Sequence, residues 1–226
     1  FPNSKYRDDA YFQLASTLSN TGRYQESIEN FNKLISKFPN SQYQTKSYLK
    51  KGLAEYNSNQ NQEAITSFKA LVENYPNSQE SAQAVKNLEQ IYIDLGQISE
   101  YAKWVKKYDF IDYSENDLAD AMYESAQQKY LNKDFKEATI IYEKFLKSYP
   151  KNVNSLNAEY ECAISYQNTE NFDKAAIHFE RVLERENNAY TLKSAEKLAV
   201  LYLEKGDQNK ALPVLIQLNN IAKQAE

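Results

Sequence analysis

The chain has 226 residues and is acidic, with a formal net charge of −4 and a pI near 5.3. Its four glycines and five prolines supply few tight-turn residues, which argues against an all-β or α/β protein and favours helices joined by short connections. Because the chain offers no cationic field to neutralise phosphates, we do not expect nucleic acid as the principal partner.

The apolar content is slightly lean and does not imply a thick core. Apolar residues make up 42% of the chain, and the mean hydropathy of −0.77 suits an elongated body whose helices each bury only part of their circumference. No apolar run approaches the roughly 18 residues needed to cross a bilayer. We therefore expect no membrane insertion in this segment.

Prolines mark a regular period along the chain. Four of them follow an aromatic residue and lie 37, 37 and 74 residues apart: Pro2, Pro39, Pro76 and Pro150. The first three are followed by Asn-Ser, a helix-stop signal, because proline cannot continue a helix and disfavours helical backbone just before it. Two further boundaries lack proline and are expected near Tyr113 and at residues 186–188. A period of 20–50 residues indicates stacked supersecondary units.

The same marks recur at the same offsets inside the units. Each of these units has two positions for a small residue. The first is occupied by Ala15, Gly52, Ala126, Ala163 and Ala199, and the second by Ser27, Ala64, Ala138, Ala175 and Ala211. Four residues later, on the same helix face, come Phe31, Phe68, Tyr142, Phe179 and Leu215. Turns are expected between the two small positions, at Gly22, Asn59, Gly96, Lys133, Glu170 and Gly206. The pattern predicts six units of two helices, about twelve helices, that cross closely at small residues; Lys69, beside Phe68, is expected to face solvent.

The third and sixth units depart from this pattern. In the third unit Tyr101 takes the second small position and no proline follows, so we expect a break in the superhelix near residues 102–114. This divides one continuous solenoid into residues 1–112, with units one to three, and residues 113–226, with units four to six. Ser114 and Asp117 resemble a capping box at the start of the fourth unit. In the sixth unit Pro213 is expected to kink its helix or delay the start of that helix.

These residues resemble the tetratricopeptide repeat in their small positions, in the Gly-x-Tyr turn at Gly22 and in the terminal proline. The period of 37 is longer than the usual 34. The resemblance implies an all-α fold, a right-handed α-solenoid of about six helix hairpins, that binds other proteins. The longer repeat with an aromatic-Pro-Asn-Ser end is similar to repeats of bacterial cell-envelope proteins, of the type found in the periplasmic coordinator of the Tol-Pal system and in the lipoprotein of the outer-membrane assembly machine. That similarity implies a periplasmic or cell-envelope location, with the cytoplasm as the alternative.

Motifs for catalysis are missing from the sequence. It has no Walker loop, no HExxH, no GxSxG and no glycine-rich dinucleotide turn, and its one histidine and one cysteine exclude a multi-histidine or thiolate metal cage. We therefore expect no enzyme, no cofactor and no metal. The acidic residues of the run Asp109, Asp112, Glu115, Asp117 and Asp120 lack the spacing of a calcium loop, and we interpret them as charges at a helix start.

Cys162 and His178 are the one pair that could form a nucleophile and its base. They stand on the two helices of one unit, so the thiol and the imidazole could approach each other. The favoured interpretation is that Cys162 is a small buried packing residue, since it occupies an apolar position of its helix.

A partner-binding groove follows from the resemblance. In the tetratricopeptide fold the first helix of each unit lines a concave face, which here implies Phe12, Leu49, Tyr56, Lys86, Gln90, Tyr123, Gln127, Tyr130, Tyr160 and Gln167. An aromatic, amide-lined groove suits an extended peptide or a partner subunit. The alternative is that these rings simply cover the helix junctions. Two other functions stay open: a glycan-binding module, with peptidoglycan as its ligand, and a hydrolase or transferase that acts through a domain outside this sequence.

The beginning of the chain matches the end of a unit. Phe1-Pro2-Asn3-Ser4 is the counterpart of Phe38-Pro39-Asn40-Ser41, so we expect a preceding repeat upstream. Without that repeat the first helix should expose an apolar patch, because each unit of a solenoid covers only its neighbours. We therefore expect weak self-association through this uncapped N-terminal end.

Overall fold

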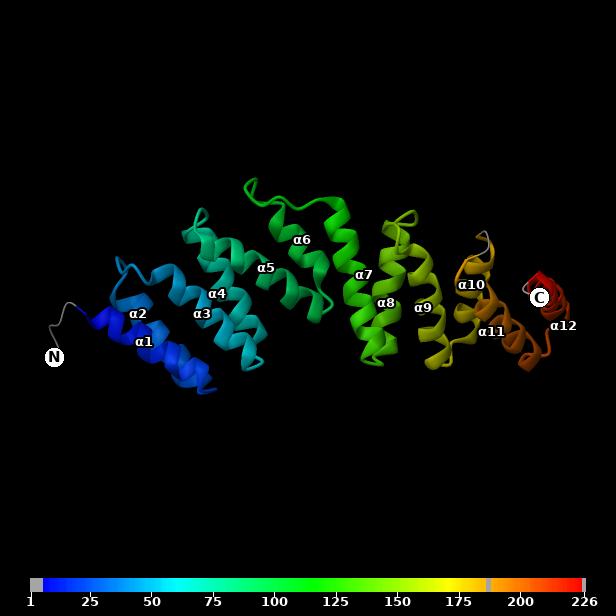
Figure 1. Ribbon diagram of the computed structural model, residues 1–226, viewed down its shortest axis with the longest axis horizontal. Helices are drawn as coiled ribbons and strands as arrows, with labels where there is room; N and C mark the ends of the chain where they lie inside the picture. Colours follow the sequence, from blue (N-terminus) through cyan, green and yellow to red (C-terminus); the bar gives the residue numbers. More distant parts are fainter. Residues whose placement is uncertain (1–5, 186–187, 225–226) are drawn as a thin grey trace. The chain divides into compact units, whose positions relative to one another are not determined.

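The computed structural model describes residues 6–185 and 188–224, and all regular structure in these ranges is helical (Figure 1). The helices are α1 Arg7–Asn20, α2 Tyr24–Lys37, α3 Gln44–Asn57, α4 Asn61–Asn74, α5 Gln79–Asp94, α6 Ile98–Val105, α7 Glu115–Leu131, α8 Phe135–Ser148, α9 Ser155–Asn168, α10 Phe172–Leu183, α11 Thr191–Glu204 and α12 Gln208–Gln224. The twelve helices confirm the predicted number. The Phe1–Ser4 motif and part of the boundary expected at 186–188 lie outside the described residues.

The chain forms two compact units, each an all-α solenoid of packed helix pairs. One unit comprises residues 1–95 and 103–112 and contains α1 to α5. The other comprises residues 96–102 and 113–226 and contains α7 to α12, and α6 is divided between them. Within each unit every helix packs against the next one along the chain. The predicted all-α solenoid is confirmed.

The six predicted turns all adopt the left-handed backbone that ends a helix. Gly22, Asn59, Gly96, Lys133, Glu170 and Gly206 have φ between 59° and 77°. In the first turn the Arg23 N–H donates to the Leu18 carbonyl at 2.9 Å, the long-range bond of a Schellman motif. The turns at Asn59, Lys133, Glu170 and Gly206 contain the same bond. Its donor is again the N–H of the residue that follows the turn residue: Gln60, Asp134, Asn171 and Asp207. The turn is thus specified by a local hydrogen-bond pattern, and glycine is not needed at every copy of it.

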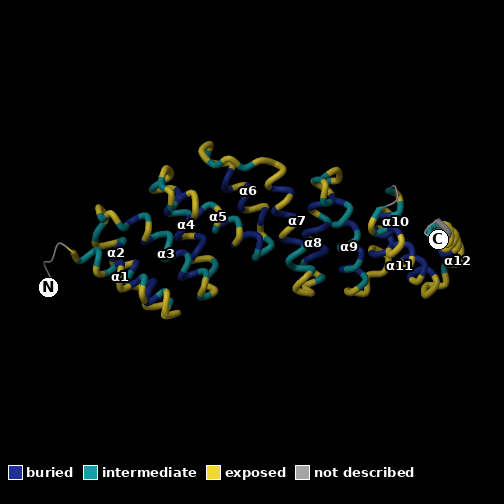
Figure 2. Tube along the Cα trace, in the orientation of Figure 1, coloured by how far each residue is buried: buried dark blue, intermediate teal, exposed yellow. Residues whose placement is uncertain are grey.

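Close helix crossings bury the predicted stripe in the interior repeats. Phe31, Phe68, Tyr142 and Phe179 are fully buried, whereas Leu215 on α12 is 37% exposed. Figure 2 shows buried and exposed positions interleaved along the helices, as a stripe on one side of each helix requires. The expectation that Lys69 faces solvent is wrong. Its Nζ donates to the Tyr92 hydroxyl at 2.9 Å and lies 5.5 Å from the ring centroids of Tyr92 and Trp104, because the outer side of α4 still meets residues of the next helix pair.

The third and sixth repeats form two helices each, although their sequences depart from the pattern. Tyr101 fits into its small-residue position with 1% exposure, its ring edge-on to Tyr113 at 5.1 Å, and α6 ends after eight residues. The capping box is confirmed: the Asp117 N–H donates to the Ser114 hydroxyl, and the Ser114 N–H donates to the Asp117 carboxylate at 2.7 Å. Helix α12 begins at Gln208, ahead of Pro213, so the expected delay of its start is wrong.

Candidate functional site

Two predicted groove residues of the second unit, Tyr123 and Gln127, bond to one carboxylate. Glu161 on α9 accepts hydrogen bonds from the Tyr123 hydroxyl at 3.1 Å, the Tyr142 hydroxyl at 2.6 Å and the Gln127 amide at 3.3 Å. Burial and the charge of Glu161 raise the pKa of Tyr123 and Tyr142, so both phenols stay protonated donors. Tyr123 is only 8% exposed. Its ring therefore ties α7 to α9 more than it faces solvent.

At two groove positions the side chain is covered by a stacked aromatic ring from the following repeat. Phe12 stacks on Tyr43 with ring centroids 4.6 Å apart, and Tyr160 stacks on Tyr190 at 4.4 Å. The two pairs occupy equivalent places, since Phe12 and Tyr160 are four repeat periods apart. Phe12 is 8% exposed and Tyr160 is half-buried. At these two places the rings cover a helix junction, which is the alternative that the sequence left open.

The remaining groove positions keep more exposed surface. In the first unit Tyr56 is half-buried and donates to the Asp94 carboxylate, which also accepts from Gln90 at 2.9 Å, and burial followed by this bond raises the pKa of Tyr56 to about 12. Leu49 is half-buried and Lys86 is exposed. In the second unit Tyr130 is half-buried against the edge of Phe135, and Gln127 and Gln167 are half-buried as well. These partly exposed aromatic and amide groups are the surface that a partner could contact.

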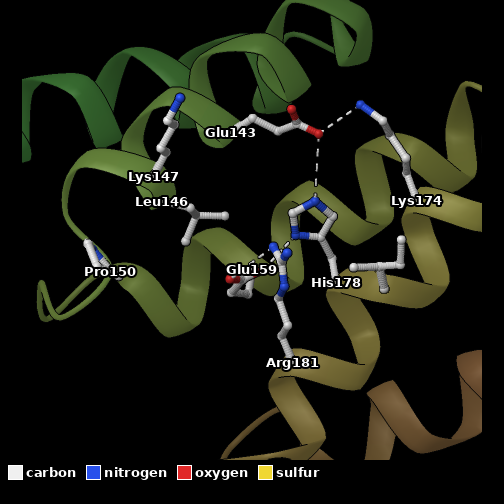
Figure 3. A pocket seen from close by; sticks show the side chains of 9 residues that line it. Glu143, Leu146, Lys147, Pro150, Glu159, Lys174, His178 and Arg181 are labelled. Carbon is white, nitrogen blue, oxygen red and sulfur yellow. Dashed lines mark hydrogen bonds and ion pairs between the residues drawn. The ribbon is translucent and has the colours of Figure 1, made fainter.

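A pocket of about 540 Å³ lies between α8 and α10 of the second unit, where the sequence gave no reason to expect one (Figure 3). Helix α9 contributes one residue to it, and the other residues stand on α8, in the segment that follows it, or on α10. The lining consists of Glu143, Leu146, Lys147, Pro150, Glu159, Lys174, Ile177, His178 and Arg181. Its volume falls within the range of small-ligand sites.

One wall of this pocket is the only histidine of the chain. His178 is 4% exposed, and its Nδ1 lies 2.5 Å from Oε2 of Glu159, which is 6% exposed. Arg181 Nη1 lies 3.8 Å from the other oxygen of Glu159, and Cys162 Sγ lies 3.6 Å from His178 Nε2. The thiol and the imidazole thus approach each other as the sequence suggested. Burial raises the pKa of the Cys162 thiol, however, so a reactive thiolate is disfavoured and Cys162 is a packing residue.

A hydrogen-bonded triad that links two repeats adjoins His178, whose Nε2 lies 4.0 Å from Oε1 of Glu143 (Figure 3). The Glu143 carboxylate accepts from the Tyr166 hydroxyl and from Lys174 Nζ at 2.9 Å, and Lys174 also lies 4.9 Å from the Tyr166 ring centroid. Burial alone would raise the pKa of Glu143, but the bonds from Tyr166 and Lys174 outweigh it and lower the pKa. The carboxylate is therefore held in its charged form.

The tyrosine–glutamate bond and the lysine over the tyrosine ring recur one repeat later, without a bond from the lysine to the glutamate. Glu180 accepts from the Tyr202 hydroxyl, and Lys210 lies 5.4 Å from the Tyr202 ring centroid. A second pocket of about 460 Å³ lies beside it, between α10 and α12. The sequence contains this recurrence: the two glutamates are 37 residues apart, the two tyrosines are 36 apart, and the two lysines are 36 apart. It does not show that the side chains contact one another.

Metal-binding and membrane-spanning features are not found in the part of the chain that the structure describes. No group of three or more His, Cys, Asp or Glu side chains there is placed to hold a metal ion. None of the described helices combines the length and apolarity that crossing a membrane requires.

Comparisons with known proteins identify the repeat. Residues 9–41, 46–78 and 120–152 match the sequence profile of the tetratricopeptide repeat. No curated protein matches the chain. A tetratricopeptide repeat protein from Parabacteroides merdae is 15% identical with a TM-score of 0.41, over 94% of this chain and 79% of that one. A kinesin light chain with nearly identical TPR-like repeats from Podosopora anserina is 17% identical with a TM-score of 0.42, over 99% of both chains. MamA is 17% identical with a TM-score of 0.42, over 77% of this chain and 95% of its own.

The matched segments coincide with the first, second and fourth repeats defined by the proline spacing. In all three, two helices cross at a small residue over a buried aromatic ring: Phe31, Phe68 and Tyr142. The finer resemblance to cell-envelope proteins of the Tol-Pal or outer-membrane assembly type finds no support in these comparisons. In these three segments, 99 of its 226 residues, the chain is similar to the tetratricopeptide repeat.

Proposed function

We propose that this chain is a non-catalytic scaffold for protein–protein interaction that holds an extended peptide or a partner subunit on the first helices of its repeats. The observation that carries the proposal is the set of half-buried aromatic and amide side chains on α7 and α9: Gln127, Tyr130, Tyr160 and Gln167. Such groups give contact area and adaptable hydrogen bonds at low entropic cost. Stacked repeats present them on an extended surface that needs no deep cavity.

The test separates partner capture from stability. Gln127 and Gln167 are half-buried amides whose replacement by Ala removes hydrogen-bonding groups and leaves the ring stacks in place. We expect Gln127→Ala/Gln167→Ala to stay folded with a modestly lower melting temperature, because the Gln127 amide loses its bonds to the Tyr123 hydroxyl at 2.8 Å and to Glu161 at 3.3 Å, but to lose most of the partner that wild-type protein crosslinks, measured by quantitative mass spectrometry. Lys136→Ala/Lys144→Ala, two exposed positions on α8, is the matched control. Equal capture by the amide variant and the wild type would contradict the proposal.

We place the scaffold in the bacterial cell envelope, with the cytoplasm as the alternative. The support is the sequence resemblance of its long repeat with an aromatic-Pro-Asn-Ser end. Cell fractionation with an antibody against the native full-length chain tests this placement, and recovery in the cytosolic fraction would exclude it.

A glycan-binding module is the second candidate function. It is favoured by the half-buried Tyr130 and Tyr160 on neighbouring first helices, because sugar rings stack on aromatic faces. Titration with peptidoglycan fragments, followed by NMR of the tyrosine rings, distinguishes the two functions. Shifts with the fragments but with no peptide would replace the first proposal by this one.

Self-association through the N-terminal end is part of the proposal. Helix α1 begins beside Tyr6, which is 64% exposed, and carries Leu14, which is 49% exposed. Leu14 has the exposure of an unpartnered apolar position, so we expect weak dimers that dissociate on dilution. Sedimentation velocity of Leu14→Gln against wild type, both at high concentration, measures the effect; identical sedimentation of the two would exclude this contact.

A further inference from the structure

The pocket between α8 and α10 has an excess of positive charge in an acidic protein. Its lining holds three basic side chains, Lys147, Lys174 and Arg181, against the two carboxylates of Glu143 and Glu159. Counting only the lysine, arginine and glutamate side chains, the lining has a formal charge of plus one, whereas the whole chain carries −4. A concave site of this sign raises the local concentration of anions.

Two of the basic side chains have donors to offer a ligand. Lys147 is exposed and forms no hydrogen bond or ion pair with any residue that the structure describes. Arg181 is 50% exposed, and its 3.8 Å approach to Glu159 is longer than a hydrogen bond. Lys174, by contrast, is already bound to Glu143 and to the Tyr166 hydroxyl. A carboxylate arriving between Lys147 and Arg181 would therefore add charge-assisted hydrogen bonds without breaking existing ones.

The pocket also offers an apolar surface beside these cations. Ile177 on α10 is 45% exposed although it stands next to the buried His178, and Leu146 and Pro150 line the pocket from the side of α8. The combination fits an acidic side chain with an aliphatic neighbour, as a protein segment presents them. A lone inorganic anion would leave the apolar surface uncovered.

We propose that this pocket binds an acidic segment of a protein partner, with a carboxylate between Lys147 and Arg181 and an aliphatic side chain against Leu146 and Ile177. The site stands mainly on the second helices of its repeats and shares no residue with the groove of the first helices, so the inference does not rest on the function proposed above. The equivalent pocket between α10 and α12 differs in charge, so we expect the acidic segment to bind the pocket between α8 and α10 in preference to it. It is lined by Glu180, Glu184 and one basic residue, Lys210, and its excess is negative.

His178 provides a direct reporter, because it is the only histidine of the chain and stands in the pocket wall. The probe is a blocked pentapeptide of alternating glutamate and leucine, titrated while the imidazole ring protons are followed by NMR. We expect a saturable shift of the His178 signals that weakens as salt is added. The same peptide with lysine in place of glutamate is the matched control and should leave these signals unmoved. A glutamate peptide that shifts nothing at millimolar concentration, or a lysine peptide that shifts them equally, would overturn the proposal.

Variants locate the contact. Lys147→Gln/Arg181→Gln should weaken binding of the glutamate peptide by about tenfold, since it removes two charge-assisted donors. Lys136→Gln/Lys144→Gln, which removes the same charge from exposed sites of α8 outside the pocket, should bind within about twofold of wild type. If loss of Arg181 disturbs folding, the single Lys147→Glu variant gives the same answer, because this exposed side chain makes no contact to lose. Unchanged affinity in Lys147→Glu would refute the site.

Discussion

Gly52 on α3 lies against the ring of Phe68 on α4, and its replacement by alanine sets two effects against each other. In an exposed helix, Gly→Ala stabilises by about 1 kcal/mol through helix propensity. Here a Cβ on Gly52 would lie 2.6 Å to 2.8 Å from three ring atoms of Phe68, a side chain with no exposed surface. Overpacking a buried ring costs about 1–3 kcal/mol, and more where the ring cannot move. We therefore expect Gly52→Ala to destabilise the fold by about 1–2 kcal/mol, the reverse of the propensity effect.

Urea unfolding followed by circular dichroism measures this, with Phe68→Leu as the background that removes the ring. In that background Gly52→Ala should become neutral or stabilising, and the difference between the two backgrounds is the coupling between the residues. In the first and fifth repeats the position equivalent to Gly52 is an alanine: Ala15 in the repeat of the buried Phe31, and Ala163 in the repeat of the buried Phe179. A Gly52→Ala variant that is more stable than wild type would show that α3 and α4 make room for the methyl group without cost and would refute the reasoning.

Three further changes test the packing, the pocket wall and the last helix. Phe68→Ala should cost about 3–5 kcal/mol by leaving a cavity, and the exposed Gln62→Ala on the same helix should melt like wild type; similar melts for both would contradict the packing stripe. Glu143 has a lowered pKa in the folded protein, so its contribution to stability is present above its unfolded pKa and lost as pH falls through the folded one. Glu143→Gln should accordingly flatten the acid side of the stability–pH curve, measured by melts from pH 7 to pH 3, and a curve parallel to wild type would argue against the triad. Pro213→Ala should stabilise α12 by about 1–3 kcal/mol, because the alanine N–H restores a helix hydrogen bond at an exposed position; a lower melting temperature would mean that the proline ring is needed there.

Much of the fold was readable from the sequence because its signals are local. The turn at Lys133 could be placed without glycine, since its position in the repeat and the six-residue Schellman hydrogen-bond pattern are set by neighbours in the chain. Ser114 and Asp117 likewise specify a helix start through contacts three residues apart. The same local residues recur in each repeat, so a correct interpretation of one repeat predicts the structure of the others.

The candidate site could be predicted only in part, because its contacts join side chains from different helices. Tyr123 has a groove offset in the sequence, yet in the structure it is held by Glu161, 38 residues further on, and is buried. Lys69 looks like a surface residue until Tyr92 and Trp104 are placed beside it. Such partners depend on how far one helix is shifted and rotated against the next.

The sequence by itself determined the repeat period, the helices, the turns and the small residues at the crossings, since these follow from backbone preferences and from the spacing of apolar side chains. Only the tertiary structure decided which charges meet. It placed His178 against Glu159 and left Lys147 and Arg181 facing the same pocket. The reason is physical: helix formation is governed by residues within one or two turns, whereas a pocket is formed by side chains that long-range packing brings together.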